Sequence, residues 1–225
     1  MTTIPAEALV FLDNLKKNNN REWFNAHKEQ FKILESQMKT FYLGVYNLMK
    51  KHDDLSDHRA YRIYRDIRFS KDKTPFKNHF SAEFNRRKPE LRGGYYLHIE
   101  PENQSFIGCG FWGPVKEDID RVRMEWDLDT GEIRGILSDQ KFKSVWGKME
   151  GEKLKSAPAG YDKNNPNIDL INYKQWIFHH SFSDEEVLSA DFAQKVDKCF
   201  QAIRPFFDYM SEVLTTDMNG VSLIR

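Results

Sequence analysis

Six lysine and arginine residues are concentrated in the segment between Arg62 and Lys77. Arginine guanidinium groups bind phosphate or carboxylate oxygens two at a time, and lysine ammonium groups add point charges. An acidic residue among the arginines would orient them rather than react itself. The segment therefore predicts a positively charged site for a phosphate- or carboxylate-bearing small molecule. Its predicted ligand-binding residues are Arg62, Arg65, Asp66, Arg68, Lys71, Lys73 and Lys77.

Two aromatic residues outside this segment complete the predicted site. Trp23 follows Arg21 and Glu22, and Tyr161 lies between Lys155 and Asp162. An aromatic ring beside cations suits a planar or phosphorylated ligand, through stacking and cation–π contact. The same two rings would serve equally well to pack their own loops, and this alternative stays open.

The basic segment has two further interpretations. Residues 61–92 contain ten Lys/Arg and four Asp/Glu, whereas residues 93–139 contain four Lys/Arg and ten Asp/Glu. Arg65, Asp66 and Arg68 could therefore form a lattice of ion pairs with the later acids, each exposed pair contributing only ~0–1 kcal/mol. Alternatively, the basic segment could belong to a non-catalytic interaction module that binds an acidic protein or nucleic acid.

No residue stands out as a nucleophile or a metal ligand. Ser70 and Thr74 flank lysines, and His79 could act as their base only if the intervening turn folds back. The sequence has no HExxH, no CxxC and no aspartate triad, so no metal site is predicted, although His98 and Glu100 share one face of a predicted strand. The residues leave open whether a reaction is catalysed and with which cofactor.

A glycine-rich run at 108–113 matches the GxGxxG pattern of dinucleotide sites. Such a site needs the glycines after the first strand of a βαβ unit, whereas this run ends the second strand of a predicted hairpin. Pro114 also removes an N–H group that would face a pyrophosphate. We therefore expect these glycines to mark a bulge or a close approach of backbone or ligand.

Four motifs together carry a family resemblance. They are NNNREWF at 18–24, RDIRFSKDKTPFK at 65–77, GCGFWGP at 108–114 and LKSAPAGYD at 154–162. This set resembles the largely bacterial domain-of-unknown-function family 2461, over nearly the whole chain. The family brings no established activity, cofactor or catalytic residues. The resemblance implies a single-domain cytoplasmic protein and draws attention to the same four motifs.

The elements that would position the site follow from hydrophobic periodicity. Apolar residues recur at intervals of three and four from Phe24 to Leu48, which predicts one amphipathic helix over about 21–50. Alternation from Arg62 to Ser70 predicts a strand that turns Ile63 and Phe69 towards the core. Other predicted strands lie near 80–84, 94–100, 105–112 and 173–182, and other helices near 5–17, 115–126, 129–137, 139–149, 183–203 and 205–214. Ser183, with Glu186 three residues later, predicts a capping box at the start of the helix near 183–203.

These elements predict an α+β fold, with an antiparallel sheet of about four or five strands covered by a long N-terminal helix and C-terminal helices. No linker, repeat or low-complexity tract interrupts the chain, so residues 1–225 are expected to form one domain. Aromatic residues make up 14% of the chain, which predicts a core filled by large rings.

Charge and hydropathy limit the classes of partner. The 34 Lys/Arg residues equal the 34 Asp/Glu residues, which disfavours nucleic acid. No run of about 18 apolar residues predicts a membrane span, and the N-terminus does not resemble a signal peptide. The two cysteines are far apart in the sequence and fit a reducing compartment. We expect a cytoplasmic protein and make no prediction of its oligomeric state.

Overall fold

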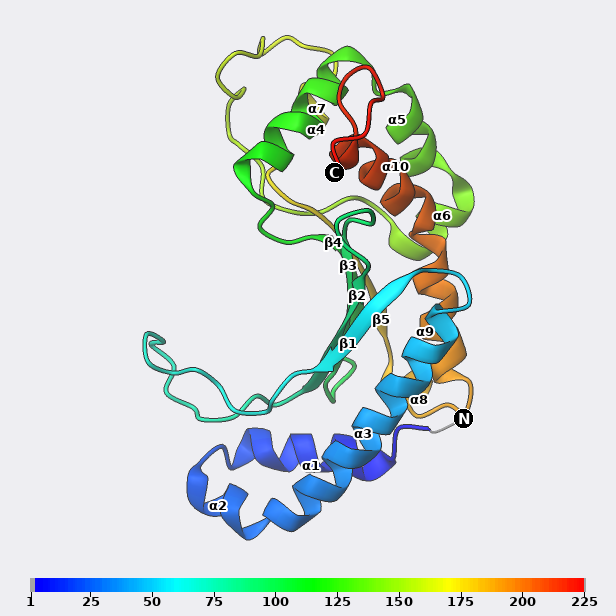
Figure 1. Cartoon of the computed structure of the whole chain (residues 1–225). Helices are drawn as coiled ribbons and strands as arrows, with labels where there is room; N and C mark the ends of the chain where they lie inside the picture. Colours follow the sequence, from blue (N-terminus) through cyan, green and yellow to red (C-terminus); the bar gives the residue numbers. More distant parts are fainter. Residues whose placement is uncertain (1–2, 225) are drawn as a thin grey trace. The chain divides into compact units, whose positions relative to one another are not determined.

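The fold is α+β and contains one antiparallel sheet of five strands, as predicted (Figure 1). The computed structural model describes residues 3–224. The strands pair in chain order, so each lies beside the next one along the chain. They are β1 (Leu55–Ala60), β2 (Phe80–Arg86), β3 (Gly94–Ile99), β4 (Ser105–Phe111) and β5 (Trp176–Phe182).

Ten helices precede, separate and follow the strands in the described part of the chain. None of them is long and apolar enough to cross a membrane. They are α1 (Ala6–Lys17), α2 (Arg21–Ala26), α3 (Lys28–Met49), α4 (Lys116–Leu128), α5 (Gly131–Ser138), α6 (Gln140–Trp146), α7 (Ile168–Ile171), α8 (Asp184–Val187), α9 (Phe192–Ala202) and α10 (Arg204–Thr215).

The chain forms two compact units, and each unit is built from three segments of the sequence. The first comprises Met1–Phe84, Tyr96–Ile107 and Ser181–Lys198. The second comprises Asn85–Tyr95, Gly108–His180 and Cys199–Arg225. The expectation of a single domain over 1–225 stays a prediction.

The predicted long helix is two helices, because the chain departs from helical geometry at His27. This residue has φ −107° and ψ 13° and separates α2 from α3. Its Nδ1 lies 2.8 Å from the carbonyl oxygen of Trp23, and its ring stacks on the Trp23 ring with centroids 4.0 Å apart. A side chain that bonds its own i−4 carbonyl competes with the backbone ladder, and periodicity does not reveal this.

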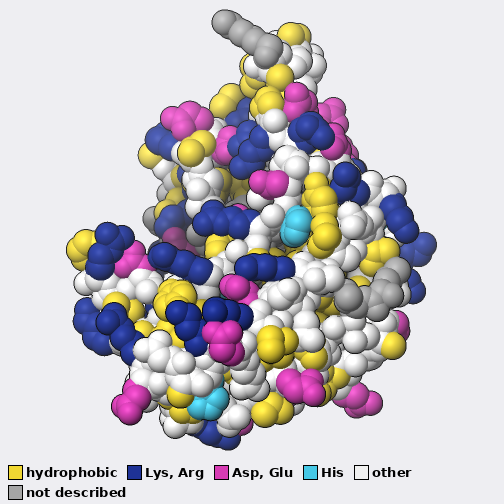
Figure 2. Space-filling view, turned by 60° about the horizontal axis from the view of Figure 1, so that its bottom comes forward, with side chains coloured by type: hydrophobic (Ala, Val, Ile, Leu, Met, Phe, Trp, Pro, Cys, Tyr) yellow, Lys and Arg dark blue, Asp and Glu magenta, His cyan; other side chains and the backbone are white. Residues whose placement is uncertain are grey.

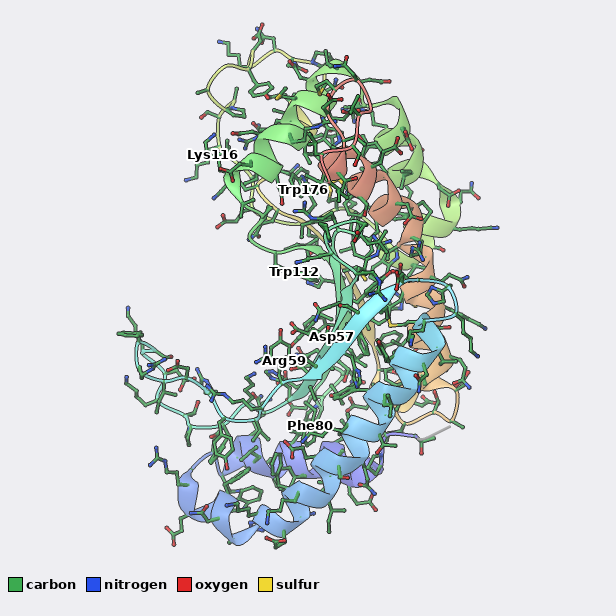
Figure 3. The ribbon with its side chains drawn as sticks, viewed as in Figure 1. Asp57, Arg59, Phe80, Trp112, Lys116 and Trp176 are labelled. Atoms are coloured by element: carbon green, nitrogen blue, oxygen red, sulfur yellow. The ribbon has the colours of Figure 1, made fainter. Side chains whose placement is uncertain are left out.

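The predicted apolar face is nevertheless buried on both sides of the interruption. Phe24 on α2 and Phe31 on α3 have ring centroids 5.1 Å apart, and both are buried. Phe31 also stacks on Phe80 at the start of β2, which is labelled in Figure 3. Further along α3 the buried residues are Leu34, Met38, Phe41, Tyr42, Val45 and Met49. This face of α3 is the core of the first unit, and the helix packs against β1.

The predicted strand at 62–70 is wrong, because this segment belongs to a long loop between β1 and β2. Ile63 is buried, but Phe69 is 96% exposed, so the alternation does not continue into the core. Within the loop, a single β-bridge joins Tyr64 to Phe76. Backbone bonds from Arg65 N to Pro75 O and from Lys77 N to Ile63 O flank that bridge.

The second unit buries aromatic rings from β4, β5 and the helices. Trp126 of α4 donates its indole N–H to the Tyr209 hydroxyl of α10 over 3.0 Å. The Trp176 ring lies edge-on to Trp126, with centroids 5.8 Å apart. These buried rings fulfil the expectation that large aromatics fill the core.

Gly110 of β4 shows the close backbone approach that the glycine-rich run predicts. Its φ is 142°, and a Cβ placed there would lie 2.0 Å from the carbonyl oxygen of Trp176, a residue labelled in Figure 3. Because backbone cannot move aside as a flexible side chain can, we expect Gly110→Ala to lower the free energy of unfolding by about 1–3 kcal/mol or more. Urea denaturation measures this loss.

Gly135 provides the matched control for this substitution. It lies in α5, and no atom stands within 4 Å of the position that its Cβ would occupy. Gly135→Ala should therefore raise the free energy of unfolding by about 0.4–1 kcal/mol, because alanine restricts the unfolded chain. Equal effects of the two substitutions would contradict the close approach at Gly110.

Candidate functional site

Residues of two of the four family-like motifs hold the basic loop on the N-terminal helices. The Asn19 side chain donates to the carbonyl oxygen of Phe76 over 2.9 Å and accepts from the Phe76 N–H over 3.1 Å. The Phe76 ring stacks on Phe24, with centroids 4.0 Å apart. The motifs at 18–24 and 65–77 are therefore neighbours in space, and these three residues have a structural role.

A groove of about 430 Å³ lies beside this attachment, entirely within the first unit. Its lining combines three cationic side chains with one carboxylate and several hydrogen-bonding groups. The lining residues are Lys16, Asn19, Arg65, Asp72, Thr74, Phe76, Lys77, Asn78 and His79. Of the predicted ligand-binding residues, the groove brings together Arg65 and Lys77.

Two of the three cations in the groove have a carboxylate partner. Lys16 of α1 pairs with Glu102, and Arg65 pairs with Asp72 and also donates to the Thr74 hydroxyl. The backbone N–H of Thr74 and the Arg65 guanidinium lower the pKa of Asp72 to about 2. Asp72 is therefore ionised at neutral pH and holds Arg65 in place.

Lys77 is the groove cation that has no carboxylate partner among residues 3–224. It is half-buried, and its Nζ stands 5.1 Å from the centroid of the Tyr61 ring. Burial and the positive charge of Arg62 lower the pKa of Lys77. The exposed Arg62 guanidinium likewise makes no ion pair in the described part of the chain. Two neighbouring cations thus repel each other beside the groove.

The other predicted basic residues lie towards the tip of the loop and do not line the groove. Arg68 binds Asp66 through two parallel hydrogen bonds, of 3.0 Å from Nε and 2.6 Å from Nη2. Lys73 donates to the Ile67 carbonyl oxygen over 2.9 Å, and Lys71 is exposed. The loop extends to the left in Figure 1, and Lys and Arg side chains gather at the left of Figure 2.

The ion pairs of the loop differ from the lattice considered from the sequence. Arg65 and Arg68 find their carboxylates within the loop itself, at Asp72 and Asp66. Both pairs are local, and the Arg68–Asp66 pair is largely exposed, with 76% and 46% of its side chains accessible. A pair of this kind contributes little to stability.

Trp23 and Tyr161 lie in different units, and neither lines the groove. The Trp23 ring is half-buried in the first unit, where it stacks on His27 and lies 5.6 Å from the Phe11 ring. Tyr161 belongs to the second unit and lies in the loop between α6 and α7. Its N–H donates to the Pro158 carbonyl oxygen, and burial raises the pKa of its hydroxyl. Their role as ligand-binding residues stays a prediction.

A cluster of two histidines and one glutamate adjoins the groove and shares His79 with it. Potential ligand atoms of His79, His98 and Glu100 all lie within 4.8 Å of one another. His98 Nε2 stands 2.8 Å from Glu100 Oε2, and the rings of His79 and His98 have centroids 4.0 Å apart. Asn78 donates to the other oxygen of Glu100 over 2.7 Å. All four residues belong to the first unit.

Burial keeps both histidines of the cluster neutral. It lowers the pKa of His79 to about 3, with smaller contributions from His98 and Lys77. It also lowers the pKa of His98, although the hydrogen bond to Glu100 acts in the opposite direction. At neutral pH each imidazole therefore carries one unprotonated nitrogen.

The sequence did not reveal this cluster, because His79 comes from a part of the chain remote from His98 and Glu100. His98 lies on β3 and Glu100 directly follows that strand, and their shared face is visible in the sequence. His79 directly precedes β2, the strand that pairs with β3. The His79 side chain reaches His98 and Glu100 only because β2 and β3 pair in one particular register. Register depends on pairing between segments that are distant in the sequence.

Comparison with known proteins identifies a family. The family described as conserved hypothetical protein (DUF2461) matches residues 7–209. No curated protein and no solved structure matches the chain. The matched region includes all four motifs, the groove and the histidine–glutamate cluster. The chain therefore belongs to the DUF2461 family.

Proposed function

We propose that the groove of the first unit binds an anionic small molecule that carries a phosphate or a carboxylate. The proposal is carried by Lys77, a half-buried ammonium in the groove without a carboxylate partner in residues 3–224. Burial and, to a smaller extent, repulsion by Arg62 lower the pKa of Lys77. An anion bound between these two cations would replace repulsion by attraction.

The remaining groove residues supply the other contacts that such a ligand requires. Arg65 is held by Asp72 and Thr74, so its guanidinium is ordered before a ligand arrives. A cation held in this way loses less conformational entropy when it binds an oxyanion. The Asn78 side chain adds an amide to the lining. From the residues predicted by sequence, the proposed ligand set therefore retains Arg62, Arg65 and Lys77.

Phosphate should raise the melting temperature of the wild-type protein at low salt and in the presence of EDTA. For a site with a Kd of about 0.1 mM, 10 mM phosphate stabilises the folded state by about 2.7 kcal/mol, which corresponds to roughly 5–10 °C at this chain length. Lys77→Met should abolish most of this shift. Without phosphate the variant should melt at the same temperature or higher, because the repulsion by Arg62 is removed.

Lys71→Met is the matched control, since Lys71 is an exposed lysine of the same loop that does not line the groove. It should keep the full phosphate-induced rise in melting temperature. That result would show that the rise depends on the groove and not on a general attraction of phosphate to the basic loop. An unchanged phosphate shift in Lys77→Met would overturn the proposal, as would a wild type that does not respond to phosphate or to a dicarboxylate.

The alternative function, an interaction module for an acidic macromolecule, has support from the tip of the loop. Phe69 is 96% exposed, and the Arg68 guanidinium lies 6.0 Å from the centroid of its ring. Lys71 is exposed nearby in the sequence. This function would depend on Phe69 and Lys71 rather than on Lys77, so the same two lysine variants distinguish the two proposals.

A further inference from the structure

We propose that His79, His98 and Glu100 form a binding site for a divalent first-row transition metal ion of the Zn²⁺ or Fe²⁺ type. The site does not require that the groove binds an anion. Two imidazoles and one carboxylate are a common protein ligand set for such ions, and they leave coordination positions open for water or substrate. Imidazole ligands disfavour Mg²⁺ and Ca²⁺, which prefer oxygen.

The distances within the cluster fit one shared ion. Ligand atoms about 2.0–2.2 Å from one metal ion lie roughly 3–3.6 Å from each other. His98 Nε2 and Glu100 Oε2 are 2.8 Å apart, and one potential ligand atom from each of the three residues lies within 4.8 Å of the others. A small rotation of the His79 or His98 ring would therefore bring all three atoms to one ion.

Partners outside the cluster orient two of its ligands. Tyr96 places its hydroxyl 3.1 Å from Nδ1 of His98, on the ring edge opposite Glu100. Asn78 donates to Oε1 of Glu100 and leaves Oε2 directed at His98. Metal-binding histidines and carboxylates characteristically have such second partners, which fix the ring orientation and the tautomer.

A purely structural role would account for the hydrogen-bonded pair of His98 and Glu100, but not for the position of His79 beside it. His98 and Glu100 satisfy each other, whereas neither ring nitrogen of His79 makes a hydrogen bond to the described residues. Its ring nevertheless lies against the His98 ring and is half-buried. A metal ion would use the nitrogen lone pair of His79 and join it to the other two ligands.

The position of the site gives the ion access to small molecules. His79 and Asn78 also line the groove of about 430 Å³, whereas His98 is buried behind them, with 8% of its surface exposed. Lys77 lies close enough to both histidines to lower their pKa values. Its positive charge repels a dication, and an anion in the same groove would offset this repulsion.

Titration with Co²⁺ tests the proposal directly, because cobalt replaces zinc and reports its ligands through visible absorption. Metal-free protein in a phosphate-free buffer should bind one Co²⁺ per chain, and Zn²⁺ should displace it while excess Mg²⁺ should not. His79→Ala should weaken Co²⁺ binding by more than about 100-fold, and Tyr96→Phe by about 10- to 100-fold, as for loss of an outer partner.

His27→Ala is the matched control for the histidine substitution. Its half-buried ring also stacks on another ring with centroids 4.0 Å apart, but it lies outside the cluster. This variant should bind Co²⁺ as the wild type does. Glu100→Gln, which preserves shape, tests the site if His79→Ala does not fold.

Either of two results would overturn the metal site. One is a wild type that binds no Co²⁺ or Zn²⁺ at protein concentrations suited to spectroscopy. The other is a folded His79→Ala or Glu100→Gln variant with wild-type affinity for Co²⁺. The phosphate melts are measured in EDTA and the cobalt titrations without phosphate, so failure of one proposal is distinguishable from failure of the other.

Discussion

Replacing Arg86 with methionine is expected to lower the free energy of unfolding by about 3–5 kcal/mol, because buried acceptors lose a charged donor. The Arg86 side chain is 0% exposed. Its Nη1 donates to the carbonyl oxygens of Arg92 and Phe207 over 2.9 and 3.3 Å, and its Nη2 binds Asp208 over 3.0 Å. All of these residues belong to the second unit.

The guanidinium also faces the Phe207 ring, with its central carbon 5.2 Å from the ring centroid. Methionine would fill similar volume but could not donate to the two carbonyl groups. Urea denaturation of Arg86→Met measures the loss, and Lys88→Met, at an exposed position of the following turn, is the control. A loss below about 1 kcal/mol would show that these carbonyl groups find other donors.

Replacing Phe31 with alanine should also cost about 3–5 kcal/mol, because it leaves a cavity in the core of the first unit. The Phe31 side chain is 6% exposed. Its ring lies 5.1 Å from that of Phe24, 6.0 Å from Phe11 and 6.1 Å from Phe80, measured between centroids. The lost ring therefore holds α1, α2, α3 and the start of β2 together.

Ile33 supplies the control on the opposite face of α3, where it is 62% exposed. Ile33→Ala should change the free energy of unfolding by about 0.5 kcal/mol or less, because alanine favours helix and little packing is lost. Chemical denaturation of both variants compares the two faces of the helix. Similar losses for Phe31→Ala and Ile33→Ala would contradict the burial of this face.

Local signals in the sequence were sufficient for most helices and for the central strands. The face from Phe24 to Val45 is buried as its period predicts, apart from the half-buried His27. The alternation at 94–100 and 105–112 corresponds to β3 and β4. Ser183 and Glu186 form the predicted capping box of α8, although the helix predicted to continue from it to 203 is divided into α8 and α9. Each of these patterns depends on residues a few positions apart, so it acts within the element that it specifies.

Strand β1 and the loop that follows it could not be placed by the same reasoning. β1 lies at the edge of the sheet, and Leu55 is its only buried residue, so it shows no alternation. The segment at 62–70 does alternate, but a strand also needs a neighbour for its backbone groups. Here the N–H groups of Arg65 and Lys77 donate instead to the carbonyl oxygens of Pro75 and Ile63, on the opposite side of the same loop. Phe69 is exposed to solvent.

Sequence alone was sufficient to identify the family, the α+β class and the concentration of charge between Arg62 and Lys77. Which charges meet depends on the tertiary structure, which brings Arg65 and Lys77 to the groove and leaves Arg68 in a local pair outside it. The tertiary structure also brings His79 to His98 and Glu100. Composition and periodicity describe neighbours along the chain, whereas a site joins side chains whose distances depend on strand register and loop path.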